Sequence, residues 1–197
     1  MENDPLIWKL VLQVFLIAIN ALFAAAEIAV ISMNDNKLAK LTAEGNVKAA
    51  RLTRMTSQPA RFLATIQVGI TFAGFLGSAF AADNFADKLV DLVKTTGLGI
   101  ETDLLRTISV ILITLILSYF TLVFGELVPK RIAMRNAEKL ALGMSGFIYI
   151  VSVIFKPIVA FLTFSTNAIL KLVGIDPNDN DDVMTEEEIR MMIDAGS

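Results

Sequence analysis

The residues best placed to do chemistry lie in the segment 124–131, FGELVPKR, which ends a long apolar run. A glutamate inside a membrane segment costs about a few kcal/mol unless it is paired or faces a wet cavity, so Glu126 is predicted to be functional. Pro129 has no N–H, and the carbonyl four residues earlier, that of Gly125, therefore lacks its helical donor. A free carbonyl beside a carboxylate offers the oxygen ligands that a hard cation such as Mg²⁺ or Na⁺ prefers.

A second interpretation of the same segment stays open. It is a helix end at the membrane interface, where Glu126 reaches toward the headgroups and Lys130 and Arg131 anchor the chain. Pro129 would then only stop a helix, and the carboxylate would hold no cation.

In the first apolar run, Leu6 to Met33, the strongly polar interruptions beyond Lys9 and Gln13 of the first turns are Asn20 and Glu27. Positions seven apart nearly eclipse on an α-helix, so both lie on one stripe. They could supply an amide and a carboxylate to a cation site. Alternatively, Asn20 hydrogen-bonds a neighbouring helix and Glu27 lies near the far headgroups.

The second apolar run, Phe62 to Ala82, carries a stripe of small and neutral polar residues. Its members follow the helical spacing i, i+4, i+7 and i+11, and they are Gln67, Thr71, Gly74 and Ser78. Such residues most often let helices pack closely. The functional alternative is that their hydroxyl, amide and exposed backbone oxygens line a pathway.

Composition identifies the class of protein that must position these groups. The chain has 197 residues, 55% of them hydrophobic, a mean hydropathy of +0.64, and apolar runs longer than a bilayer crossing needs, which indicates an integral membrane protein. It has no Cys and no His, which excludes thiolate nucleophiles, disulfides, the usual zinc sites and histidine acid–base chemistry. No nucleophile or phosphate-binding motif accompanies the glutamates, so an enzyme is not expected.

The hydropathy pattern predicts an all-α membrane protein with three spanning helices: Leu6–Met33, Phe62–Ala82 and about Thr107–Val128. On the third, Ser118 and Thr121 lie on the same side as Gly125. The apolar segments 140–155 and 158–173, separated by Lys156 and Pro157, are each short for a full crossing. They form either one kinked span or two short re-entrant or interfacial helices, and the sequence leaves both open.

Charge segregation predicts the orientation. Residues 34–61 carry six basic side chains against two acidic ones, on an amphipathic pattern expected to lie as a helix on the cytoplasmic surface. Residues 83–106 carry five acidic side chains against three basic ones and belong outside. The N-terminus is thus predicted to be external and the C-terminus cytoplasmic, in a multi-pass protein of the cell membrane. Contact of the basic run with lipid headgroups is secondary, and nucleic acid is not an expected partner.

The predicted domains are a transmembrane domain over 1–175 and, over 176–197, an acidic linker that opens a cytoplasmic helix. The segment 176–188 holds seven acidic residues and no basic one. The pattern of Thr185 and Glu188 is typical of a capped helix start. We therefore expect a further, cytoplasmic domain after this segment.

Four motifs together resemble the transmembrane domain of the CorC/CNNM family of magnesium transporters. They are the segment 20–27 (NALFAAAE), the stripe from Gln67 to Ser78, the segment 124–130 (FGELVPK) and the closing segment 184–188 (MTEEE). The resemblance covers essentially the whole chain. It implies three spanning helices, a pair of short helices, a belt-like juxtamembrane helix and a homodimer. It also implies a following cytoplasmic pair of cystathionine-β-synthase-type domains, which bind ATP and Mg²⁺.

The resemblance further implies Mg²⁺ export, driven by inward Na⁺, and a set of cation ligands. Matched position by position, the implied ligands lie on all three spanning helices: Asn20 and Glu27, Gly74 and Ser78, and Gly125 and Glu126. One departure is that many relatives have Ser just before the first-helix glutamate, whereas this chain has Ala25 and Ala26. A ligand there must be a backbone carbonyl or come from another helix.

Two functional hypotheses follow. In the first, the stripes converge on a Mg²⁺ or Na⁺ site that opens to one side of the membrane and then the other. In the second, the helices are a non-transporting anchor for a cytosolic sensor domain, and the polar residues only join helices. A pure anchor has no need of two intramembrane carboxylates, Glu27 and Glu126, which favours the first.

Overall fold

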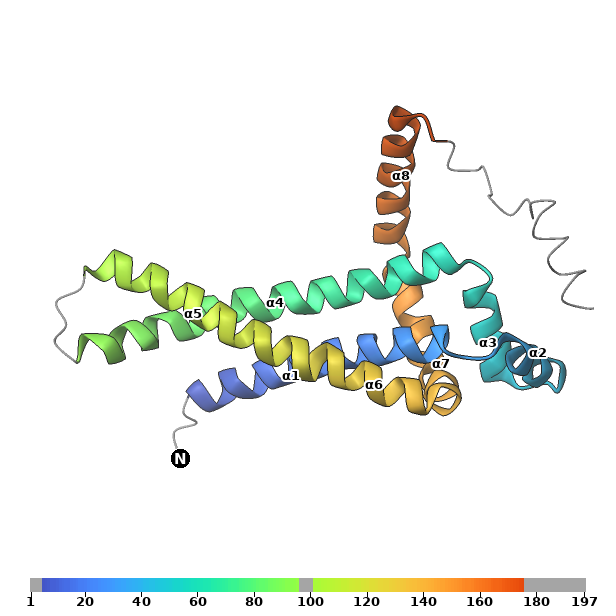
Figure 1. Ribbon diagram of the computed structural model, residues 1–197, viewed down its shortest axis with the longest axis horizontal. Helices are drawn as coiled ribbons and strands as arrows, with labels where there is room; N and C mark the ends of the chain where they lie inside the picture. Colours follow the sequence, from blue (N-terminus) through green and yellow to red (C-terminus); the bar gives the residue numbers. More distant parts are fainter. Residues whose placement is uncertain (1–4, 96–100, 176–197) are drawn as a thin grey trace, which may run out of the picture. The chain divides into compact units, whose positions relative to one another are not determined.

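The computed structural model describes residues 5–95 and 101–175, and within those ranges every regular element is helical (Figure 1). In chain order the elements are α1 (Pro5–Ile31), α2 (Asp35–Ala43), α3 (Val47–Thr56), α4 (Pro59–Lys94), α5 (Thr102–Leu122), η1 (Val123–Leu127), α6 (Val128–Arg135), α7 (Ala137–Ile154) and α8 (Lys156–Val173). The predicted acidic linker, 176–197, lies outside the described residues.

Within the described ranges, five helical segments are long and apolar enough to cross a membrane: α1, α4, the continuous α5–η1–α6 segment, α7 and α8. The all-helical, multi-pass class is therefore confirmed, while the count of three spanning helices stays a prediction. The chain divides into two compact units at Lys156 and Pro157. The first contains α1–α7, and the second contains nearly all of α8, which is a regular helix of 18 residues.

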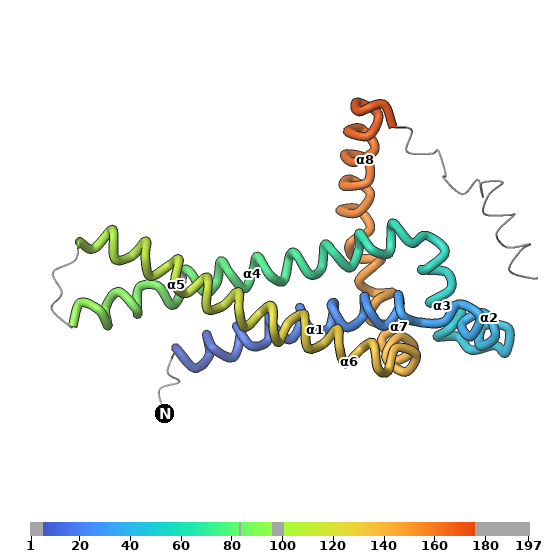
Figure 2. The backbone as a smooth tube through the Cα atoms, in the orientation of Figure 1, coloured from blue at the N-terminus to red at the C-terminus, as the bar shows by residue number. Residues whose placement is uncertain are grey.

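In the first unit, α1 packs against α4, η1, α6 and α7, and the α5–η1–α6 segment lies alongside α1 and α4 (Figures 1 and 2). Glycine makes the contact between α1 and α4 close. A Cβ atom added to Gly69 would lie 2.6 Å from the ring of Phe23, which is itself buried. Gly69, which lies near the predicted stripe but is not a member of it, thus lets the two helices approach closely.

The segment that contains the predicted site is a π-helical turn. The amide of Val128 donates to the carbonyl of Val123, five residues back, so η1 is one residue wider per turn than the helices it joins. Pro129 cannot supply the usual donor to Gly125, which removes the competing α-helical bond. The helix nevertheless continues to Arg135, beyond the end near Val128 that the sequence predicts.

The basic segment 34–61 forms the two helices α2 and α3 and the first residues of α4, instead of the single amphipathic helix that the sequence predicts. Gly45, at φ +84°, ends α2, and the side chain of Asn46 caps α3 by accepting from the amides of Lys48 and Ala49. A left-handed glycine followed by an N-cap residue is a strong helix break. Leu38 of α2 and Leu52 of α3 are buried, so the predicted apolar faces are used.

The predicted external segment is largely helical. With 36 residues, α4 is about 54 Å long at 1.5 Å per residue, well beyond the ~30 Å of a hydrocarbon core. Its C-terminal part and the start of α5 are joined by an ion pair of 3.3 Å between Asp87 and Arg106. Further along the chain, α7 buries Ala141, Ser145 and Ile148 on one face, against α1 and α3.

Candidate cation site

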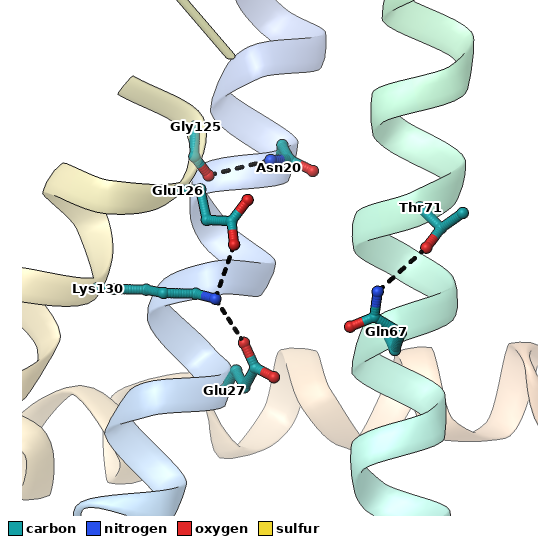
Figure 3. A network of polar contacts seen from close by, with 7 residues as sticks. All are labelled: Asn20, Glu27, Gln67, Thr71, Gly125, Glu126 and Lys130. Atoms are coloured by element: carbon teal, nitrogen blue, oxygen red, sulfur yellow. Dashed lines mark hydrogen bonds and ion pairs between the residues drawn. The ribbon is translucent and has the colours of Figure 1, made fainter. Parts of the chain in front are cut away.

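Two carboxylates from different elements meet at one ammonium group (Figure 3). Lys130 of α6 places its Nζ 2.9 Å from Oε1 of Glu126 in η1 and 3.1 Å from Oε2 of Glu27 in α1. The three side chains are only 26%, 32% and 17% exposed, respectively. We call these three residues the carboxylate–lysine cluster.

The cluster is a strong electrostatic feature because it lies among apolar helices. Two carboxylates and one ammonium leave a net charge of −1 if all three are ionised. Ion pairs removed from water recover the cost of desolvation only with good geometry and further hydrogen bonds. The sequence leaves open whether Lys130 is an interface anchor, whereas the structure turns its ammonium toward Glu27 and Glu126.

A second contact lies next to the cluster. The amide Nδ2 of Asn20 donates to the carbonyl of Gly125 at 3.1 Å (Figure 3). The expectation that this carbonyl is free is therefore wrong, because the amide of another helix takes the place of the donor that Pro129 lacks. Gly125 permits the contact, since an added Cβ would lie 3.1 Å from Nδ2 of Asn20 and 3.4 Å from the carbonyl oxygen of Ile17.

The other half of the Asn20 amide has no partner. Asn20 is 3% exposed, and its Oδ1 is buried without a hydrogen bond. In Figure 3 this oxygen points away from Gly125. An amide oxygen can coordinate a hard cation or accept a hydrogen bond from water. Asn20 lies seven residues before Glu27, on the same face of α1.

The predicted stripe of α4 does not join the cluster by any hydrogen bond within the described residues. Gln67 donates to Thr71 at 3.4 Å, and both side chains are exposed on α4 (Figure 3). A Cβ added to Gly74 would meet nothing within 4 Å, so Gly74 is not a packing glycine. Ser78 is half-buried. Gly74 therefore lies beside open space, while the carboxylates are held by Lys130.

Among the residues that the structure describes, no hydrogen bond joins the predicted hydroxyls of α5 to the cluster. Ser118 is exposed and Thr121 is half-buried. An aromatic row lies along the same part of the chain. The ring of Phe120 contacts that of Tyr119 at a centroid distance of 5.6 Å and stacks on that of Phe124, in η1, at 6.0 Å. This surface is mainly apolar and aromatic.

Gln13 is not among the site residues predicted from the sequence. It precedes Asn20 by seven residues, as Asn20 precedes Glu27, so the three form one α1 polar stripe about 21 Å long. Gln13 is 6% exposed, and neither Nε2 nor Oε1 has a partner. Among the described residues, every buried side-chain nitrogen or oxygen without a partner belongs to Gln13 or Asn20. Extending the seven-residue spacing one step toward the N-terminus would have found it.

Replacing Gln13 with leucine is expected to raise the free energy of unfolding by about 1–3 kcal/mol. Leucine fills a similar volume and removes two buried polar atoms whose desolvation is uncompensated. Thermal unfolding of the two proteins in detergent measures the difference. The matched control is Gln67→Leu, since Gln67 is exposed. A lower melting temperature for Gln13→Leu alone would mean that Gln13 binds a partner whose loss outweighs the gain.

A separate cleft of about 750 Å³ lies where the end of α1 meets α2, α6 and the start of α7. Its charged lining consists of Lys37, Arg135, Glu138 and Lys139. Lys37 and Glu138 form an ion pair across it. None of the candidate site residues lines this cleft, so it is distinct from the carboxylate–lysine cluster.

The acidic side chains alone do not make a metal site. Within residues 5–95 and 101–175, no three side chains of the His, Cys, Asp and Glu types converge. A bound metal ion would therefore need neutral oxygens as well. The amide of Asn20 hydrogen-bonds the carbonyl of Gly125, the residue before Glu126, so both neutral groups lie near that carboxylate (Figure 3).

Comparison with known proteins gives a family match over nearly the entire chain. The model of the cyclin M (CNNM) transmembrane N-terminal domain matches residues 11–197. The UPF0053 protein sll0260 of Synechocystis sp. is 34% identical over 182 residues, which are 92% of this chain and 40% of that protein. The polyamine export protein of Haemophilus influenzae is 29% identical over 93% of this chain and 42% of its own length. The chain thus spans about two fifths of these relatives.

Proposed function

Since the chain belongs to the family of cyclin M (CNNM) transmembrane domains, we propose that it exports a cation across the membrane and that this cation is Mg²⁺. The observation that carries the proposal is the pair of carboxylates, Glu27 and Glu126, held together by one ammonium among apolar helices. Such a pair is costly in a membrane, and a site that must bind and release a cation needs it.

Mg²⁺ prefers six oxygen ligands at about 2.0–2.1 Å and gives up its water reluctantly. In the proposed site, Glu126 and Glu27 supply charge, and Oδ1 of Asn20 and the Gly125 carbonyl supply neutral oxygens. Gly74 and Ser78 of α4 contribute when α4 approaches the cluster during the transport cycle. Na⁺ entering along the same stripes is the proposed driving ion.

The proposal includes a topology. The helices α1 and α4 and the α5–η1–α6 segment cross the bilayer, with the N-terminus external and residues 176–197 cytoplasmic. The helices α7 and α8 are re-entrant or interfacial, and two copies of the chain form a homodimer. The cytoplasmic regulatory domain, which would bind ATP, follows in the longer protein, as the greater length of the relatives supports.

A polyamine is the second candidate cargo, and one observation favours it. The carboxylates of Glu27 and Glu126 already bind a primary ammonium, that of Lys130, at ordinary ion-pair distances of 3.1 and 2.9 Å. A terminal ammonium of a polyamine has the same chemistry. The relative from Haemophilus influenzae that is named a polyamine export protein is similar over 93% of this chain.

Flux measurements on the full-length protein in proteoliposomes test these candidates. We expect Mg²⁺ placed on the side of the membrane that the cytoplasmic surface of the protein faces to cross faster than in protein-free liposomes. An inward Na⁺ gradient should accelerate this Mg²⁺ export. Movement of spermidine without Mg²⁺ would assign the polyamine instead. If neither cation moves, the protein is a membrane anchor and the proposal is wrong.

A further inference from the structure

Lys130 differs from the other basic residues that follow the π-helical turn. Arg131 and Arg135 are exposed and, within the described residues, form no ion pair. Lys130 is partly buried and directs its ammonium to both carboxylates of the cluster (Figure 3). It occupies the place that the cargo would take between Glu27 and Glu126.

The charges show why the cargo and Lys130 exclude each other. With the lysine in place the cluster has a net charge of −1, so a divalent cation added to it would bring the charge to +1 beside an ammonium. If the divalent cation replaces the ammonium, the cluster becomes neutral. Like charges at contact distance repel strongly in a medium of low dielectric constant, so replacement is favoured over addition.

We propose that Lys130 is a tethered competitor of the cargo. Its ammonium holds Glu27 and Glu126 when the site has no cargo, leaves both when a cation binds, and returns to displace that cation. This inference rests on the proposed function and adds the group that releases the cargo. A lysine suits the role because its ammonium is a compact charge on a flexible four-carbon stem.

The same exchange sets the selectivity between ions. Replacing the ammonium with Na⁺ or K⁺ leaves the cluster at −1, so a monovalent ion gains no charge advantage over the lysine. Mg²⁺ neutralises the cluster and therefore has a charge advantage over the lysine. Lys130 is therefore a specificity-determining residue that favours divalent over monovalent cations.

The first test compares Mg²⁺ binding by full-length wild type and Lys130→Gln in detergent, by calorimetry with MgCl₂. Without the competitor, we expect Mg²⁺ to bind at least about tenfold more tightly. Transport in proteoliposomes should be slower, because release loses its displacing group. The control is Lys139→Gln, which removes an exposed lysine outside the cluster and should bind as wild type does. Unchanged or weaker Mg²⁺ binding by a folded Lys130→Gln overturns the proposal.

A second measurement uses the wild-type protein and does not depend on how Lys130→Gln folds. Acetic anhydride labels free amines, and mass spectrometry reports the labelling of each lysine. MgCl₂ should increase the labelling of Lys130 several-fold, because the ammonium leaves the carboxylates, and should leave that of Lys139 unchanged. Labelling of Lys130 that stays constant or falls contradicts the exchange.

The outcomes separate this inference from the function on which it rests. If wild type binds and moves Mg²⁺ while neither Lys130 measurement responds as expected, the function stands and the tethered competitor is wrong. If wild type neither binds nor moves Mg²⁺, the magnesium function and the Mg²⁺ exchange fail together.

Discussion

Replacing Glu126 with glutamine is expected to leave the protein folded and to reduce Mg²⁺ transport about 30-fold or more. The amide keeps the size of the side chain and an oxygen that can accept from Lys130, whose Nζ lies 2.9 Å from Glu126 Oε1. The cluster then contains one carboxylate and one ammonium and is neutral before any cargo binds. A cation entering it loses one charged ligand, worth about 2 kcal/mol, which corresponds to the expected factor.

Glu138→Gln is the matched control, because Glu138 also pairs with a lysine, Lys37, but at the separate cleft. We expect Glu138→Gln to transport Mg²⁺ at the wild-type rate in proteoliposomes and Glu126→Gln to fail. Equal rates for Glu126→Gln and wild type would make Glu126 an anchor at a helix end. The transport mechanism proposed here would then be wrong.

Elements set by local sequence could be predicted well. The first apolar run, predicted over Leu6–Met33, is the helix Pro5–Ile31. The predicted break at Lys156 and Pro157 is where α7 and α8 separate. Both features follow from hydropathy and from the residues that interrupt it, so predicting them requires no knowledge of the tertiary structure. The division of 34–61 at Gly45 and Asn46 was missed, although a glycine before an N-cap residue signals it.

The contacts of the candidate site could not be predicted in the same way. Lys130 lies four residues from Glu126 but 103 residues from Glu27, and only packing of α6 against α1 brings the latter pair together. A lysine after an apolar run is typical of an interface anchor, so its local sequence gives no sign of the bridge. The partner of the Gly125 carbonyl was missed for the same reason, since Asn20 is 105 residues away.

The π-helical turn combines both kinds of information. Pro129 predicts that the α-helical bond to Gly125 is missing, and this is a local effect. That the chain continues as a wider turn instead of ending depends on α1, because the Asn20 amide donates to the orphaned carbonyl and Gly125 lets the backbones approach. Sequence therefore identifies the irregular position, and packing decides its geometry.

Replacing Pro129 with alanine is expected to leave the melting temperature without Mg²⁺ at or above that of wild type while removing most of the Mg²⁺-dependent increase. The new N–H can donate to the Gly125 carbonyl, and the ring no longer clashes with the preceding turn, so the helix gains regularity. This bond competes with Asn20, now bonded to the same oxygen at 3.1 Å. Relaxing η1 to an α-helical turn would also rotate Glu126 relative to Lys130, because one residue corresponds to about 100° of helix.

Thermal unfolding with and without MgCl₂ measures both effects on one sample. A ligand that binds only the folded protein stabilises it by about 2.7 kcal/mol at a hundredfold excess over Kd, so loss of the site is readily seen. Pro59→Ala is the control: Pro59 is in the first turn of α4, where its missing N–H has no helical acceptor in any case, so this variant should keep the full Mg²⁺ response. A full response in Pro129→Ala as well would mean that Pro129 does not prepare the Gly125 carbonyl for the cation, and that the wide turn serves packing against α1 alone.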